Sequence, residues 1–214
     1  MAIISQTRFE WGALDLAILS LGAVTVGIYP TTTAEQVHYI LGHSKARLCF
    51  REANVAEVPG AVPINDDALG QLRAEGRVEL AQEPGLIEKL SAQVKPTDVA
   101  TLVYTSGTTG MPKGAILTHG ALYDISKLGI ESLDVSGRDV GVSYLPMAHV
   151  LTRVNYYGSI HVGAIAFIAD GIEKVGEAWK AAHPTVVSAV PRVLEKIRIR
   201  ILENVKAASA GKQR

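Results

Sequence analysis

Short apolar runs alternate along most of the chain with longer segments in which apolar and polar positions recur at helical spacing. The apolar runs predict strands over residues 2–4, 24–28, 46–50, 61–64, 102–104, 115–117, 140–145, 164–169 and 185–190. The segments between them predict helices over residues 9–21, 31–42, 66–75, 84–94, 119–133, 150–161 and 172–182, and from Pro191 to about residue 207. Alternation of this kind is typical of βαβ units, so the predicted fold class is α/β with mostly parallel sheets.

One apolar stretch, residues 11–29, approaches the length that crosses a membrane. Asp15 lies within it and Gly22 divides it. We therefore predict a helix before Gly22 and a buried strand after it, rather than a membrane span.

The composition is that of a globular protein with a sizeable core, because 48% of the 214 residues are hydrophobic and 20% are charged. Lys and Arg together number 21, as do Asp and Glu, so the charge balance argues against a general nucleic-acid-binding protein. The single cysteine, Cys49, cannot form an internal disulfide and lies in an apolar run, which predicts a buried strand residue. A reducing, cytoplasmic setting fits this cysteine usage.

The chemically most informative stretch is residues 101–119, TLVYTSGTTGMPKGAILTH. Its candidate binding residues lie between two predicted strands and are Thr105, Ser106, Gly107, Thr108, Thr109, Gly110, Lys113 and Gly114. Glycine lets backbone N–H groups turn towards a ligand, and successive N–H groups form an anion-binding concavity. Hydroxyl groups add donors, and Lys113 adds a positive charge on a flexible stem. The stretch therefore predicts a triphosphate site, with a plain surface turn as the alternative.

The same stretch differs from the two commonest phosphate-binding motifs. Pro112 stands where GxxxxGK[ST] needs its second glycine, and there is no GxGxxG before a helix. The sequence YTSGTTGMPKGAILTH instead resembles, almost residue for residue, the phosphate-binding signature of the adenylate-forming superfamily. That superfamily includes acyl-CoA synthetases, adenylation domains and luciferases.

Further segments resemble the long-chain fatty acyl-CoA synthetase branch of this superfamily: residues 8–11, 22–26, 28–31, 43–47, 144–150 and 190–197. The resemblance implies that residues 1–214 form part of the large N-terminal domain of the adenylate-forming fold. A first α/β segment covers 1–95, and the phosphate-loop segment covers 96–214. The family's later motifs and its C-terminal domain are absent from the sequence. We therefore expect a partial AMP-binding domain with little or no ligase activity on its own.

The resemblance also implies a two-step reaction that uses ATP, Mg²⁺ and coenzyme A. A fatty-acid carboxylate attacks the α-phosphate of Mg-ATP, giving an acyl-adenylate and pyrophosphate, and the coenzyme A thiol then displaces AMP. The phosphate-loop residues hold the ATP phosphates in this scheme, and Thr105 is also the candidate contact to Mg²⁺. His149 is the candidate catalytic residue, near the acyl and nucleotide pockets. Arg192 is equally well explained as a surface cation.

Arg153 marks a departure from the family pattern. After the histidine motif the long-chain branch usually has an aromatic residue, an acidic residue and an arginine. Here the run is Leu151-Thr152-Arg153. The missing acid leaves the ion-pair partner of Arg153 open.

Two other functions remain open on the sequence. The first is a non-catalytic module that has the same sheet and binds a nucleotide but catalyses no reaction. The second is an adenylating enzyme that carries out the first step on an amino acid or an aryl acid. In the leading interpretation the partners are the small molecules fatty acid and ATP. A fatty-acid enzyme in the cytoplasm is also compatible with peripheral membrane association, and exposed sheet edges predict self-association.

Overall fold

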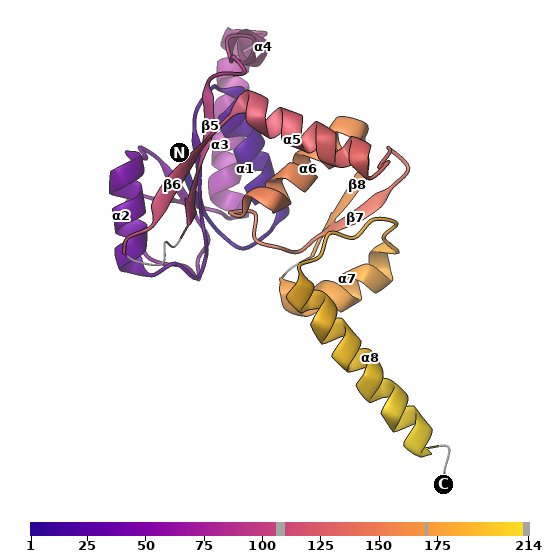
Figure 1. Cartoon of the computed structure of the whole chain (residues 1–214). Coiled ribbons are helices and arrows are strands. Elements are labelled where there is room, and N and C mark those ends of the chain that lie inside the picture. The colour runs from indigo at the N-terminus through magenta and orange to yellow at the C-terminus, as the bar shows by residue number, and fades with distance from the viewer. Residues whose placement is uncertain (106–109, 170, 212–214) are drawn as a thin grey trace.

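The computed structural model describes residues 1–105, 110–169 and 171–211, which form two sheets flanked by helices (Figure 1). The first sheet comprises β1 (Ala2–Ile4), β2 (Thr25–Ile28), β3 (Cys49–Arg51), β4 (Val62–Pro63), β5 (Val99–Thr105) and β6 (Lys113–Thr118). The second comprises β7 (Val140–Ser143) and β8 (Ile165–Ile168). The helices are α1 (Phe9–Ser20), α2 (Ala34–Ser44), α3 (Asp66–Gln82), α4 (Leu86–Ser91), α5 (His119–Ser132), α6 (Val150–Val162), α7 (Val175–Ala182) and α8 (Pro191–Gly211), with a 3-10 turn, η1, over Ile172–Lys174.

The first sheet has the strand order β4-β3-β1-β2-β5-β6 and is parallel except for the β5–β6 pair, which confirms the predicted α/β class. Gly27 of β2 lies between Ile3 of β1 and Val103 of β5. Because parallel strands end at the same edge of a sheet, the loops after β1, β2 and β5 meet at that edge. In open α/β sheets, ligands bind at this carboxyl edge.

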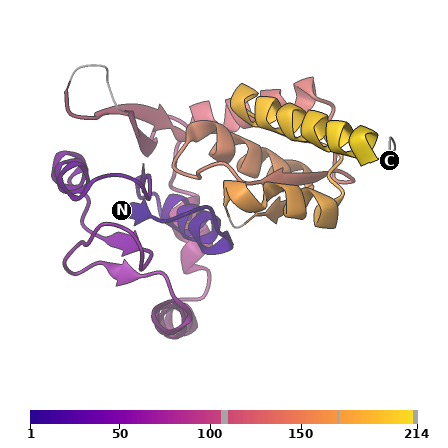
Figure 2. The ribbon, with the colours of Figure 1, turned by 90° about the horizontal axis from the view of Figure 1, so that it is seen from below.

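Helices cover both faces of the first sheet, with α2 on one face and α1 and α3 on the other (Figures 1 and 2). On the α2 face, Val37 and Ile40 pack against side chains of β1 and β2. On the opposite face, Trp11 of α1 and Leu69 of α3 join a cluster with Ile3 of β1. The core of this part of the chain is therefore divided by the sheet into two apolar layers.

The apolar stretch 11–29 folds as predicted, into most of α1, a turn at Gly22 and then β2. Trp11 and Ile18 are buried in the core, and the acidic side chain of Asp15 is buried with them. No helix in the described part of the chain is both long enough and apolar enough to cross a membrane. Cys49 is buried in β3, also as predicted, and burial raises the pKa of its thiol to about 11.

The second sheet is smaller and parallel, and α5 and α6 pack against each other beside it (Figure 1). Tyr144, which follows β7, packs with Trp179 of α7 and Val193 of α8 in a separate apolar cluster. The segment after β7 leads through Pro146 to His149, where α6 begins. This second unit therefore presents the histidine motif to the first sheet.

The strand predicted over residues 185–190 is wrong, because in this run only Val186 forms an isolated bridge, to Gly141 of β7. Thr185 Oγ1 accepts a hydrogen bond from the backbone N–H of Val140 at 2.9 Å and donates one to Asp139 at 2.8 Å. The Thr185 hydroxyl thus accepts the hydrogen bond from Val140 N–H that a backbone carbonyl would accept in a regular pair of strands. Threonine competes with regular structure in this way.

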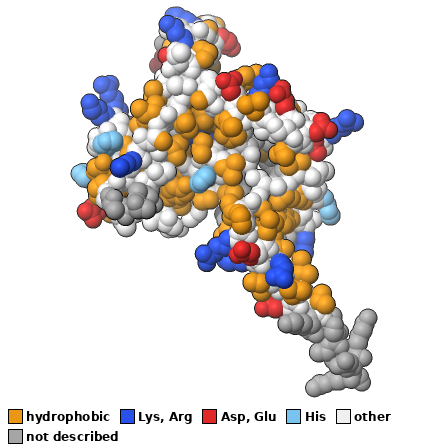
Figure 3. Space-filling model, in the orientation of Figure 1, with side chains coloured by type: hydrophobic (Ala, Val, Ile, Leu, Met, Phe, Trp, Pro, Cys, Tyr) orange, Lys and Arg blue, Asp and Glu red, His pale blue; other side chains and the backbone are white. Residues whose placement is uncertain are grey.

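The last helix, α8, projects away from the rest of the molecule and reaches Gly211, beyond its predicted end near residue 207 (Figure 1). Val193 near its start is buried, whereas Leu194, Ile201 and Val205 are exposed. Figure 3 shows hydrophobic side chains continuing along this helix. The apolar residues of α8 are therefore covered only at its first turns. Two other boundaries also differ from prediction, since α3 is longer and α4 is shorter.

Candidate functional site

The phosphate-loop segment connects β5 and β6, which form an antiparallel hairpin at the side of the first sheet (Figure 2). Thr105 and Lys113 lie opposite each other at the end of this hairpin, and both are exposed. Directly opposed residues of antiparallel strands project from the same face. A hydroxyl and an ammonium group therefore lie on one side of the hairpin end. Four predicted residues lie outside the described part of the chain: Ser106, Gly107, Thr108 and Thr109.

The two described glycines of the predicted site serve different purposes. Gly110 has a φ of 119°, a conformation that glycine adopts without strain. Gly114 lies opposite Tyr104 in the hairpin, and a Cβ atom added to it would be 3.0 Å from Cζ of the Tyr104 ring. The Tyr104 hydroxyl is 2.7 Å from Nδ1 of His43 on α2, and burial raises the pKa of Tyr104. Gly114 therefore provides space for a ring that links α2 to the strand before the phosphate loop.

Replacing Gly114 with alanine is expected to lower the free energy of unfolding by about 1 kcal/mol, because the added methyl group presses on the Tyr104 ring. Urea unfolding followed by circular dichroism measures this change. In a Tyr104→Leu background the same substitution is expected to cost less, since the ring is gone. Equal costs in both backgrounds would show that the ring is not the reason for glycine here.

The segment that carries His149 is fixed at the carboxyl edge of the first sheet. Thr7, in the loop after β1, donates a 2.7 Å hydrogen bond from Oγ1 to the carbonyl of Leu145. Ala148 packs directly on β2, since a Cβ atom built on Gly27 would lie 3.0 Å from the Ala148 Cα. Gly27 is paired with Val103, two residues before the end of β5. The histidine segment and the phosphate-loop hairpin thus converge on one edge of the sheet.

His149 is exposed and is the N-cap residue of α6. Its Nδ1 accepts a hydrogen bond from the backbone N–H of Leu151 at 3.2 Å. An accepting Nδ1 places the hydrogen of the neutral imidazole on Nε2. His149 can therefore donate from Nε2 to a ligand beside the helix.

The partner of Arg153 is Asp15 of α1, which lies 138 positions earlier in the sequence. Arg153 and Asp15 are 1% and 0% exposed, and two guanidinium nitrogens lie 2.7 and 3.1 Å from the two carboxylate oxygens. Arg153 also donates to Thr101 Oγ1 on β5 at 2.6 Å, and Thr101 donates in turn to the carbonyl of Thr25 at 2.7 Å. Tyr157 also donates a hydrogen bond to Asp15. This cluster joins α6 to α1, β2 and β5.

The charges in this cluster are mutually stabilised. Burial by itself opposes the charged form of Arg153, but the facing carboxylate of Asp15 holds the pKa of Arg153 above its ordinary value. Burial and the negative charge of Asp15 raise the pKa of Tyr157 well above its ordinary value. Tyr157 therefore stays protonated and remains a donor to Asp15. The sequence signal for this pair was Asp15, the one acidic residue within the apolar stretch 11–29.

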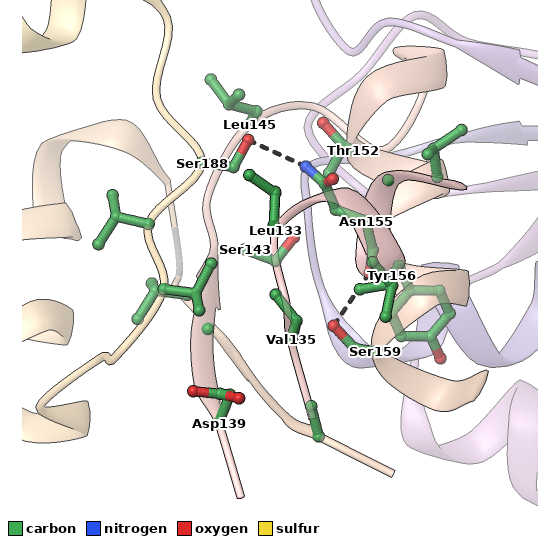
Figure 4. A pocket seen from close by; sticks show the side chains of 18 of the residues that line it. Leu133, Val135, Asp139, Ser143, Leu145, Thr152, Asn155, Tyr156, Ser159 and Ser188 are labelled. Atoms are coloured by element: carbon green, nitrogen blue, oxygen red, sulfur yellow. Dashed lines mark hydrogen bonds between the residues drawn. The ribbon is translucent and has the colours of Figure 1, made fainter. Parts of the chain in front are cut away.

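A cavity of about 340 Å³ lies between α5, α6, β7 and residues 186–189 (Figure 4). Its apolar lining includes Ile130, Leu133, Val135, Val142, Leu145 and Val154. Its polar lining includes Asp139, Ser143, Thr152, Asn155, Ser159 and Ser188. Ligand pockets of proteins commonly enclose roughly 300–1,000 Å³ and combine such an apolar wall with a few polar groups. The cavity therefore has the size and lining of a small-molecule site.

The cavity begins beside the histidine motif. Leu145 belongs to that motif and Thr152 follows it in the first turn of α6, and both line the same end of the cavity (Figure 4). Asp139 lines the opposite end (Figure 4). Asn155 donates to Ser188 Oγ at 2.9 Å, which links α6 to the 186–189 segment across the cavity wall.

Arg192, for which the sequence left a surface cation equally open, is exposed in the first turn of α8. Within the described residues, no three His, Cys, Asp or Glu side chains come together to hold a metal ion. The only predicted metal contact, Thr105, has its hydroxyl at the hairpin end beside Lys113. A Mg²⁺ ion held through ATP phosphates needs few protein ligands, so this arrangement is compatible with Mg-ATP.

Comparison with known proteins supports the resemblance seen in the sequence. A long-chain-fatty-acid–CoA ligase of Mycobacterium bovis is 38% identical, over 100% of this chain and 38% of that protein. A peroxisomal long chain acyl-CoA synthetase of Arabidopsis thaliana is 32% identical, over 97% of this chain and 32% of that protein. The chain thus spans about two-fifths or less of the length of these relatives.

Solved structures share the fold. The fatty acyl CoA synthetase of Mycobacterium tuberculosis superposes with a TM-score of 0.73 at 26% identity, covering 92% of this chain and 40% of that one. The o-succinylbenzoate coenzyme A synthetase of Bacillus subtilis in complex with AMP has a TM-score of 0.71 at 20% identity, covering 91% of this chain and 50% of that one. At that identity the second likeness concerns the fold alone.

The profile of one protein family, described as AMP-binding enzyme, matches residues 1–214. Because that match extends over every residue, the chain belongs to the family of AMP-binding enzymes.

Proposed function

We propose that this chain provides the phosphate-binding and acyl-binding part of an ATP-dependent, AMP-forming ligase that joins a long-chain fatty acid to coenzyme A. In the first step a carboxylate oxygen bonds to the α-phosphorus of ATP, and pyrophosphate leaves. In the second step the coenzyme A sulfur, having lost its proton, bonds to the acyl carbon, and AMP leaves. The observation that carries the proposal is the convergence of the Thr105–Lys113 hairpin end and the His149 segment on one sheet edge.

The hairpin end suits the phosphates because negative charge must be held there while pyrophosphate leaves. Lys113 is exposed, and its flexible stem can bring the ammonium group to the β- and γ-phosphates. Thr105, on the same side of the hairpin, offers a hydroxyl to the phosphates or to their Mg²⁺ ion. Positioned donors of this kind stabilise charge without reorganisation during the reaction.

The cavity suits an aliphatic acid. Its apolar lining is largely aliphatic, and its Leu145–Thr152 end lies next to the segment that carries His149. An acid bound with its chain among Ile130, Leu133 and Val135 has its carboxylate at the His149 end. An aryl acid or an amino acid, the alternative substrates, would leave most of this aliphatic wall without contact, so we favour a fatty acid.

Lys113→Ala tests the phosphate site. We expect the affinity for Mg-ATP to fall at least tenfold, because a charge-assisted contact to phosphate is lost. Isothermal titration calorimetry at one fixed salt concentration measures this, since screening changes such contacts. Lys180→Ala, on the exposed face of α7, is the matched control and is expected to bind Mg-ATP as the unchanged chain does.

Two outcomes would count against the proposal. If Lys113→Ala and Lys180→Ala bind Mg-ATP equally well, Lys113 does not hold phosphate. If the unchanged chain binds benzoate or amino acids in preference to palmitate, the acyl assignment is wrong while the phosphate assignment stands.

A further inference from the structure

Thr152 carries a buried hydroxyl group for which the described residues provide no hydrogen-bond partner. The residue is 4% exposed, and it lines the cavity. A buried hydroxyl without a partner is costly, and most buried side-chain polar groups in proteins are paired with protein or with ordered water. Such a group inside a cavity therefore points to a ligand that completes its hydrogen bonding.

The position of Thr152 narrows the chemistry of that ligand. It lies in the first turn of α6, three residues after His149, at the cavity end that Leu145 and Ser188 also line (Figure 4). The remainder of the wall combines aliphatic side chains with polar ones, among them Tyr144, whose buried hydroxyl also lacks a partner among the described residues, and its opposite end is at Asp139 (Figure 4). The aliphatic side chains of the wall suit an aliphatic chain, and the end of such a ligand that meets Thr152 must accept a hydrogen bond.

We propose that Thr152 binds the substrate carboxylate, with its hydroxyl donating a hydrogen bond to a carboxylate oxygen of the fatty acid at the His149 end of the cavity. This inference rests on the proposed function, because it presupposes that the cavity holds the acyl chain. The hydroxyl group holds the carboxylate at the end of the cavity that Leu145 also lines. Thr152 thus positions the nucleophile of the first step without taking part in proton transfer.

The structure offers a matched control for a substitution at this position. Thr25 on β2 is 0% exposed, and its Oγ1 also lacks a hydrogen-bond partner among the described residues. Thr25 does not appear among the residues that line the cavity. Threonine and valine have nearly the same shape, so Thr152→Val and Thr25→Val each remove one buried, unpaired hydroxyl. Neither change is expected to lower thermal stability, because each removes an uncompensated polar group.

The test uses the full 214-residue chain and laurate that carries ¹³C in its carboxyl group. Calorimetry gives the affinity, and the carboxyl chemical shift against pH gives the pKa of the bound acid. A hydrogen bond to the ionised form lowers that pKa. We expect Thr152→Val to reduce laurate affinity about tenfold or more and to raise the pKa of the bound acid by about one unit. Thr152→Ser, which keeps the hydroxyl, and Thr25→Val are expected to match the unchanged chain.

The outcomes separate this inference from the proposed function. If the unchanged chain does not bind laurate, the assignment of the cavity to the acyl chain is wrong, and the proposed role of Thr152 is overturned as well. If laurate binds but Thr152→Val changes neither affinity nor pKa, the hydroxyl holds only a water molecule, and this inference alone is overturned. If Thr152→Val and Thr25→Val weaken binding equally, the effect is general repacking, which also overturns it.

Discussion

Asp15→Asn is expected to lower the free energy of unfolding by about 3–5 kcal/mol, a large part of the stability of a domain of this size. The substitution keeps the shape of the side chain but leaves the guanidinium of Arg153 buried without a counter-charge. Arg153 is 1% exposed, so water cannot replace the lost carboxylate. An uncompensated buried charge is among the most destabilising single changes in a protein.

Urea unfolding followed by circular dichroism measures the effect, with Glu83→Gln as the matched control. Glu83 pairs with Lys89 at 2.6 Å, but both side chains are at least half exposed. Exposed pairs contribute little, so this control is expected to change stability by less than about 1 kcal/mol. Equal effects of the two substitutions would show that the Asp15–Arg153 pair is not desolvated as described.

A double substitution separates the effect of the buried charges from the effect of the volume that the two side chains fill. Asp15→Leu combined with Arg153→Met removes both charges and keeps an apolar side chain at each position. Buried ion pairs can often be replaced in this way at little cost, so the double variant is expected to be more stable than Asp15→Asn. A double variant that is no more stable would mean that the hydrogen bonds to Thr101 and Tyr157, rather than the unpaired charge, dominate.

The Asp15–Arg153 cluster is also a feature that could not be predicted in full from the sequence. Apolar runs predicted the strands of the first sheet well, because burial on both faces makes parallel strands nearly continuous in hydrophobicity. The partner of Arg153 could not be predicted, since a local pattern carries no information about a residue 138 positions away. A single acid in the apolar stretch 11–29 indicates that a partner exists but does not identify it.

The site shows the same division between local and long-range information. The two strands that flank the phosphate-loop segment were predicted from short apolar runs, which are local, whereas their antiparallel pairing was not predicted. The run 185–190 was predicted as a strand from its apolar residues, but the Thr185 hydroxyl occupies the place of a ladder acceptor. The cavity and the unpaired hydroxyl of Thr152 arise from the packing of α5, α6 and β7, for which no single segment carries a signal.

Gly27 is a second position where the site depends on long-range packing. It lies in a central strand, where glycine is itself unfavourable because it loses more conformational freedom on folding than alanine. A Cβ atom at this position would lie 3.0 Å from the Ala148 Cα and 3.2 Å from Cζ2 of Trp11. The first of these neighbours is backbone and cannot rotate away. Glycine here allows the His149 segment to rest directly on the sheet.

Gly27→Ala is therefore expected to lower the free energy of unfolding by about 2–3 kcal/mol, in the upper range for overpacking, although alanine is favoured over glycine within a strand. Gly141→Ala in β7 is the matched control, because a Cβ atom there meets only the Val186 carbonyl oxygen, at 3.9 Å. Urea unfolding is expected to show no loss of stability for the control.

The same pair of variants tests whether the sheet sets the position of His149. If Ala148 rests on Gly27, the added methyl group must displace the segment that leads into α6, and the hydrogen bond from Thr7 to Leu145 is strained with it. NMR shifts of the His149 ring are then expected to change in Gly27→Ala and to stay constant in Gly141→Ala. If Gly27→Ala is destabilised but the His149 shifts are unchanged, the Trp11 side chain, and not the Ala148 backbone, has moved to make room for the methyl group. The sheet would then support the histidine motif without fixing its position.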